Sequence, residues 1–235
     1  MKKQLLKIIT IAVSACVLLS LTACSKLDII GNGSQASFEE VLNIIPVQYS
    51  ETEKTWFITA PDGAAEFHWS RTSGTKKALS SWVAHYYDAF IEFDPAPFIA
   101  AGLDTNKLPD TILFLDNKLI VGTELELSES DNKDEELTAI DSFRNIVKSN
   151  RERIGHHSAM DHFGIKLDNG NMFEWARDIS TNDKDIVFVI NPEPFIAAGT
   201  DPDKIEGWVY SKVEMMDENG NKIEEPKILK PFNLK

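Results

Sequence analysis

The chain has 235 residues with 24 basic and 37 acidic side chains, which give a formal net charge of −13. This acidity argues against nucleic acid and anionic lipid headgroups as binding partners, because like charges repel. The two cysteines, Cys16 and Cys24, lie near the N-terminus, so the remainder of the chain has neither disulfides nor cysteine-bound metal. About 200 residues are enough for one or two small domains held by a hydrophobic core.

The N-terminus has the parts of an export signal. Three lysines within the first seven residues precede an apolar run at 8–21, which is shorter than the roughly 20 residues that span a bilayer comfortably. Residues 21–24 read LTAC, with small residues before a cysteine. This ending resembles the lipobox of bacterial lipoproteins. The resemblance implies that 1–23 is a signal peptide and that Cys24 carries acyl chains such as palmitate.

That resemblance implies a protein anchored in the cell membrane by its N-terminal lipid and facing the outside of the cytoplasm. Two or three acyl chains suffice for stable anchoring. Removal of residues 1–23 takes away three lysines and no acidic residue, so the charge of the side chains falls from −13 to −16.

One phrase occurs twice in the chain. Residues 94–104 read DPAPFIAAGLD, and residues 191–201 read NPEPFIAAGTD. Around this phrase, 88–108 and 185–205 align without gaps, with ten of 21 positions identical. A second block aligns at an offset of 106, which pairs Phe57, Asp62, Phe67, Trp69 and Arg71 with Phe163, Asp168, Phe173, Trp175 and Arg177. Matching order and spacing indicate an internal duplication.

The elements of one copy can be predicted in chain order. A helix follows Ser37 as N-cap in the first copy and begins near Ser142 in the second. A hairpin comes next, turning at residues 61–63 or 168–171, and then a buried strand at 89–93 or 186–190. The repeated phrase predicts a short helix, capped by Asp94 or Asn191 and ended by a glycine. A last strand, at 111–115 or 208–213, closes with a hairpin.

The sequence therefore predicts an α+β fold of two homologous helix-hairpin-strand-helix-strand units with mainly antiparallel sheet. We expect a tether at 24–36, unit 1 at 37–123, an acidic linker at 124–136 and unit 2 at 137–235. The units could form an internal pseudo-dimer with one core or two separate bodies, and the short linker favours the pseudo-dimer. An insertion at 72–87 is specific to unit 1.

A cluster of metal-ligating residue types is specific to unit 2. It contains His156, His157, Asp161 and His162, and imidazole suits zinc, copper or nickel. The spacing of four between His157 and Asp161 would place both on one face of a helix. The alternative is a polar helix end, where cations favour the dipole.

Two further patterns are candidates for binding. Asp104 and Asp201 each begin a run of oxygen side chains that could bind calcium, although the rest of a calcium loop is missing and Asx turns are the alternative. Trp69, Arg71, Trp175 and Arg177 recur at alternating strand positions, where they could line a ligand cleft. The alternative is that each tryptophan belongs to the core and each arginine lies at the edge of that core.

We expect a lipid-anchored surface protein with a non-enzymatic role, binding a small ligand or an envelope partner. The alternatives are a metal-dependent enzyme or metal-binding protein that uses the histidine cluster, and a purely structural envelope protein. The sequence contains no recognisable set of catalytic residues that would favour an enzyme.

Overall fold

The computed structural model describes residues 32–70, 76–78, 84–127, 137–157, 161–176, 185–216 and 221–233. The predicted signal peptide, the lipidation site Cys24, Arg71 and Arg177 lie outside these residues, as does 128–136 of the predicted linker. In the described part of the chain, no helix is long and apolar enough to cross a membrane.

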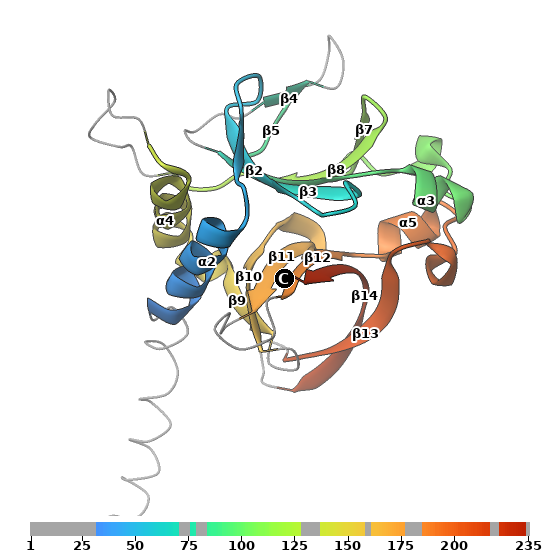
Figure 1. Ribbon diagram of the computed structural model, residues 1–235. Coiled ribbons are helices and arrows are strands. Elements are labelled where there is room, and N and C mark those ends of the chain that lie inside the picture. Colours follow the sequence, from blue (N-terminus) through green and yellow to red (C-terminus); the bar gives the residue numbers. More distant parts are fainter. Residues whose placement is uncertain are drawn as a thin grey trace, which may run out of the picture.

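Two six-stranded antiparallel sheets dominate the structure (Figure 1). The N-terminal sheet has the order β1-β2-β3-β6-β8-β7, and the C-terminal sheet, read from β9, has the order β9-β10-β11-β12-β14-β13. The two orders correspond strand for strand. The predicted mixed fold with mainly antiparallel pairing is confirmed, with more sheet than helix.

The strand bounds follow the chain. The N-terminal sheet contains β1 (Gln48–Ser50), β2 (Thr55–Thr59), β3 (Ala65–Ser70), β6 (Ala89–Phe93), β7 (Leu113–Leu115) and β8 (Lys118–Thr123). The C-terminal sheet contains β9 (Ile154–His157), β10 (His162–Lys166), β11 (Met172–Ala176), β12 (Asp185–Ile190), β13 (Val209–Met216) and β14 (Lys222–Asn233). Strands β4 (Lys76–Ala78) and β5 (Ala84–Tyr86) pair within the insertion.

The helices gather at two ends of the sheets. Figure 1 shows α2 (Asn32–Ile44) beside α4 (Ala139–Ser149) at one end, and α3 (Ala96–Ala100) beside α5 (Glu193–Ala197) at the other. Four single-turn 3₁₀ helices complete the described elements: η1 (Thr105–Lys107), η2 (Arg151–Arg153), η3 (Asp168–Gly170) and η4 (Pro202–Lys204).

A continuous core fills the space between the two sheets. Phe67 of β3 stacks on Phe173 of β11, with ring centroids 4.0 Å apart and planes at 7°. Phe38 of α2 lies 4.0 Å from Phe143 of α4 and also contacts Trp175. Burial of such large side chains is the main source of stability. Both sheets and both long helices therefore depend on the same core.

The two copies of the repeated phrase contact each other. Phe98 of α3 and Phe195 of α5 are fully buried with ring centroids 5.1 Å apart. The backbone N–H of Asp104 donates to the carbonyl of Ala198 at 2.9 Å, and that of Asp201 donates to Ala101 at 2.8 Å. The phrase therefore forms a reciprocal junction between the halves of the chain.

The N-caps of these short helices are Pro95 and Pro192, one residue after the predicted Asp94 and Asn191, whose side chains still bond the first turn. Asp94 Oδ1 accepts from the Ala96 N–H at 2.9 Å, and Asn191 Oδ1 accepts from the Glu193 N–H at 3.0 Å. Gly102 and Gly199 have φ of +106° and +102°. A Cβ on Gly102 would also lie 2.7 Å from the Gly199 carbonyl oxygen, so glycine permits the junction as well as the helix end.

Several predicted boundaries and orientations are wrong. Helix α2 begins at Asn32, so part of the predicted tether is helical and Ser37 lies inside the helix. The N-cap of α4 is Thr138, whose Oγ1 accepts from the Asp141 N–H at 3.1 Å. Ser37 and Ser142 instead bond the opposite half: Trp175 Nε1 donates to Ser37 Oγ, and Ser142 Oγ donates to the Ser70 carbonyl, both at 3.1 Å.

The alignment of Phe57 with Phe163 is wrong by one residue. Phe57 pairs with His68 across β2 and β3, whereas Phe163 pairs with Trp175 across β10 and β11. Because side chains alternate along a strand, the two phenylalanines lie on opposite faces. The residue that corresponds to Phe57 is Gly164, which pairs with Glu174.

The isoleucines that follow Phe98 and Phe195 in the short helices point to solvent: Ile99 is 45% exposed and Ile196 is 42% exposed. On a helix of five residues only Phe98 or Phe195 faces the core. The described start of the predicted acidic linker is ordered against its neighbours, because the Leu125 N–H donates to Asp88 Oδ2 at 3.0 Å and Leu125 is buried.

Candidate functional site

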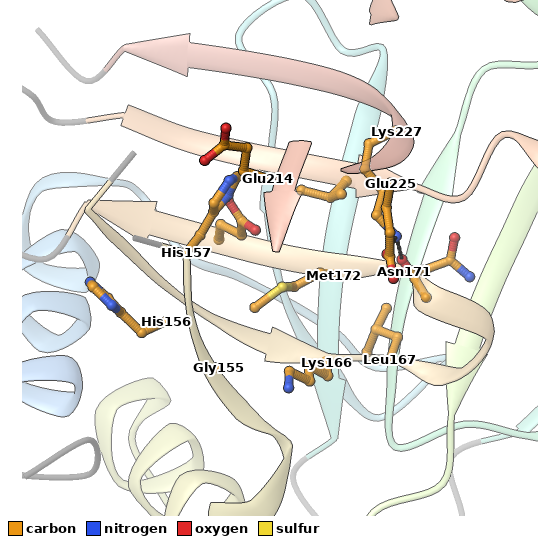
Figure 2. A pocket seen from close by; sticks show the side chains of 13 residues that line it. Gly155, His156, His157, Lys166, Leu167, Asn171, Met172, Glu214, Glu225 and Lys227 are labelled. Atoms are coloured by element: carbon orange, nitrogen blue, oxygen red, sulfur yellow. Dashed lines mark hydrogen bonds and ion pairs between the residues drawn. The ribbon is translucent and has the colours of Figure 1, made fainter. Parts of the chain in front are cut away.

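A pocket of about 380 Å³ lies on the outer face of the C-terminal sheet (Figure 2). In Figure 2 the side chain of Met172 occupies the middle, with His157 and Glu214 on one side and Asn171 and Lys227 on the other. Strands β9 to β12 supply the floor, and the β13–β14 hairpin supplies Glu214, Glu225 and Lys227. The pocket thus combines an apolar floor with charged walls.

Two glycines on neighbouring strands make room for the side chains at the floor of this pocket, and Gly155 itself lines it. Gly155 of β9 and Gly164 of β10 are register partners, and they correspond to Gln48 and Phe57 of the N-terminal sheet. A Cβ on Gly155 would lie 2.7 Å from Lys166 Cε and 3.1 Å from Met172 Cε. The flexible side chains of Lys166 and Met172 therefore lie over the strands, where the other sheet has larger residues.

A buried polar group lies at one side of the pocket. His157 Nδ1 donates to Glu174 Oε2 at 3.1 Å, and His162 Nδ1 lies 3.6 Å from the same oxygen. All three side chains are at most 8% exposed. His162 Nδ1 has no hydrogen-bond partner in the described part of the chain. An uncompensated buried polar atom is costly, so this nitrogen is the least satisfied atom of the group.

The environment of Glu174 favours its charged form. Burial would by itself raise the pKa of this carboxyl, because charge is poorly solvated in the interior. The contacts of the carboxylate with His157 and His162 outweigh burial and lower the pKa below its ordinary value of 4.5. Glu174 is therefore a charged carboxylate at neutral pH, held beside two imidazoles.

The four predicted metal ligands divide into two pairs on a β-hairpin, where a helix end had been considered. His157 and His162 are register partners on the outer face beside Glu174. His156 points away from His157 in Figure 2, and its Nε2 lies 2.9 Å from Asp161 Oδ1. Neighbouring residues of a strand face opposite sides. The four side chains do not converge on one point. Glu174, which the sequence did not suggest as a site residue, lies beside His157 and His162.

The other predicted candidates have structural surroundings. Trp69 and Trp175 are fully buried in the core, so neither lines a cleft, and their partner arginines lie outside the described residues. Asp104 Oδ1 accepts from the Asn106 N–H at 3.1 Å, and Asp201 Oδ1 accepts from the Asp203 N–H at 3.3 Å. These are the Asx turns considered above, and each carboxylate also pairs with a lysine.

The outer face of the N-terminal sheet has a different polar group. His68 occupies the position of Glu174, and its ring lies between Phe57 and Phe90 with centroids 5.0 and 4.3 Å away. Its Nε2 lies 3.2 Å from Glu66 Oε2. The hydrogen bond from His68 is the main cause that lowers the pKa of Glu66 below its ordinary value. Periodicity could have placed these side chains on one face, but only the strand order brings in Glu92.

Comparisons with known proteins leave the site to be interpreted from its own chemistry. No protein-family model matches the chain, and searches of curated proteins and of solved structures found no significant match.

Proposed function

We propose that this is a lipid-anchored protein of the cell surface with a non-enzymatic role, which binds a small ligand in the pocket of the C-terminal sheet. The observation that carries the proposal is the pocket lined by Gly155 on the outer face of the C-terminal sheet, a face on which the N-terminal sheet carries Gln48 and Phe57 at the positions of Gly155 and Gly164. Its volume lies in the range of about 300–1,000 Å³ that is usual for small-molecule sites.

The lining favours a small amphipathic ligand. Met172 and Val189 offer an apolar floor, and the thioether of methionine adapts to differently shaped ligands. The His157–Glu174 pair and Lys227 offer a few fixed polar groups at the edges. Such a small number of polar groups in an apolar pocket orients a ligand and gives specificity.

The proposal extends to the organisation of the chain, which we interpret as a duplicated unit packed as an internal pseudo-dimer. The matching strand orders, the reciprocal hydrogen bonds of the repeated phrase and the common core support it. In this interpretation the inner faces hold the halves together and the outer faces can differ. Ligand binding by one half is then a specialisation of that half.

Ligand-observed NMR with a fragment library of small amphipathic compounds tests the pocket. We expect hits that bind the native protein and lose binding in Gly155→Gln, which introduces the residue of the N-terminal sheet and meets only the flexible ends of Lys166 and Met172. The matched control is Gln48→Gly, the reverse exchange in the other sheet, which should retain every hit.

Two results would contradict the proposed function. Hits that bind Gly155→Gln as well as the native protein would place binding elsewhere. Saturable turnover of a cell-wall polymer or another substrate by the purified protein would show an enzyme.

The membrane anchor has a separate test. Cys24→Ala should abolish labelling with radioactive palmitate and leave the protein released or unprocessed. Normal cleavage and full retention in the membrane fraction would refute the lipobox interpretation and leave the pocket proposal untouched.

A further inference from the structure

We propose that Glu66, His68 and Glu92, on the outer face of the N-terminal sheet, form a binding site for a divalent transition-metal ion such as zinc. This site is independent of the ligand pocket, because it lies on the other sheet.

The backbone brings the three side chains to one place. Glu66 and His68 are two residues apart on β3 and share a face, and Glu92 of β6 is the register partner of Glu66. One ligand atom from each residue lies within 4.8 Å of the other two. Among the described residues, no other group of three histidine or carboxylate side chains has its ligand atoms this close together.

The spacing is close to that of a metal site. Zinc bonds of about 2.0–2.2 Å place the ligand atoms of a tetrahedral site about 3.4 Å apart. His68 Nε2 and Glu66 Oε2 are 3.2 Å apart, so this pair needs little movement. Glu92 completes the triad by a small adjustment of its side chain.

Neighbouring groups orient the ligands from behind. Thr55 Oγ1 hydrogen-bonds His68 Nδ1 at 3.0 Å, which leaves Nε2 for the glutamates. The Thr59 hydroxyl donates to Glu66 Oε1 at 3.1 Å and leaves Oε2 facing His68. Outer hydrogen bonds of this kind fix the ring orientation and the carboxylate in metal sites. The flanking rings of Phe57 and Phe90 hold the imidazole plane.

The charges favour a cation between the strands. Two carboxylates directly opposite each other across a sheet repel, and the side chain of Glu92 is only 14% exposed. A divalent ion balances both negative charges and takes the place of the proton on His68 Nε2. Lys118 Nζ lies 4.0 Å from Glu92 Oε1 and competes with a metal ion for this carboxylate.

The ligand set also indicates the class of metal. One imidazole nitrogen with two carboxylate oxygens suits zinc and similar divalent transition metals, whereas calcium and magnesium prefer oxygen ligands alone. Glu66 is in contact with solvent, with 23% of its side chain exposed. The equivalent residues of the C-terminal sheet are Met172, Glu174 and Val189, which cannot form the same site.

Isothermal titration of the purified, untagged full-length protein with zinc chloride tests the proposal. We expect one zinc ion per chain and no competition from calcium. Cobalt(II) added to the metal-free protein should give the visible absorption of a four- or five-coordinate ion, and zinc should then displace it. Glu92→Gln and His68→Gln should each weaken zinc binding by at least about tenfold, because each removes a direct ligand. The control is His156→Gln in β9, the edge strand of the C-terminal sheet. This variant should bind zinc as the native protein does.

A variant that binds zinc more tightly provides a further control, because misfolding can explain a loss of affinity but not a gain. Lys118→Gln should tighten zinc binding about two- to fivefold, because it removes a partly exposed cation that competes for Glu92. Less than about 0.1 zinc per chain in the native protein would overturn the site. So would zinc binding that persists in His68→Gln and is lost in His156→Gln.

Discussion

On the outer face of the N-terminal sheet the ring of His68 is stacked between Phe57 and Phe90, whereas at the same place on the C-terminal sheet Glu174 lies beneath a pocket. Both residues occupy the middle of strands that correspond in order and register. The inner faces, by contrast, carry the same residue types, with Phe67 and Trp69 corresponding to Phe173 and Trp175. Side chains that share one core are constrained together, while side chains on the outer faces can differ.

The largest expected effect concerns the shared inner face. Phe67→Ala and Phe173→Ala should each lower the free energy of unfolding by about 3–5 kcal/mol, because each leaves a cavity beside the stacked ring of the other sheet. Urea unfolding followed by tryptophan fluorescence and by circular dichroism should show one coincident transition for each variant.

The control for this pair is Phe114→Ala in β7, whose side chain is 40% exposed, and it should change stability little. Two separate transitions, with only one moved by Phe67→Ala, would contradict a common core.

A second effect distinguishes the outer faces. Glu174→Ala should cost about 2–3 kcal/mol, because it leaves His157 buried without its hydrogen-bond acceptor and removes the carboxylate beside His162. Glu66→Ala should cost less than about 1 kcal/mol, since the carboxylate is partly exposed and solvent screens its contact with His68. Chemical unfolding in the presence of a chelator measures both. Equal losses in the free energy of unfolding would contradict the expectation that the more buried carboxylate contributes more.

A smaller effect is expected at the junction of the repeated phrase. Gly102→Ala should lower stability by about 1–2 kcal/mol, because alanine disfavours positive φ and its Cβ would meet the Gly199 carbonyl at 2.7 Å. Gly199→Ala should cost somewhat less, since its closest contact is 3.0 Å. Thermal unfolding of both variants checks the order, and an unchanged melting temperature in either would contradict the close approach.

The smallest expected effect is the dependence of stability on pH. Because the pKa of Glu174 is lower in the folded protein than its ordinary value of 4.5, the unfolded chain binds the proton more readily. The stabilisation is therefore complete above pH 4.5 and is lost as the pH falls through the folded pKa. Lys166, Lys227, Glu214 and Glu225 also face the pocket, so the comparison must be with a variant.

The matched variant is Glu174→Gln. Its deficit in the free energy of unfolding should be constant near neutral pH and should shrink below pH 4.5. A deficit that stays the same down to pH 3 would show that the ionisation of Glu174 does not contribute.

The sequence predicted the parts of the fold that depend on local chemistry. The bonds of Asp94 and Asn191 to the first turn and the glycines that end the short helices follow from local preferences of single residues, although the N-caps are the prolines that follow. The predicted cap at Ser37 failed, because its hydroxyl binds Trp175 from a strand far away in the chain. Histidine spacing likewise suggested a helical ligand set, but His156 and His157 lie on opposite faces of a strand.

By itself the sequence determined the duplicated pattern, the type of most elements and the acidic charge, because these depend on composition and on neighbours along the chain. Only the tertiary structure decided the register of β2 and β10, the contact of the repeated phrase with its copy, and the meeting of Glu174 with His157 and Glu66 with Glu92. Strand order and pairing place residues far apart in the chain within a few ångströms of each other. Both candidate sites are made of such pairs.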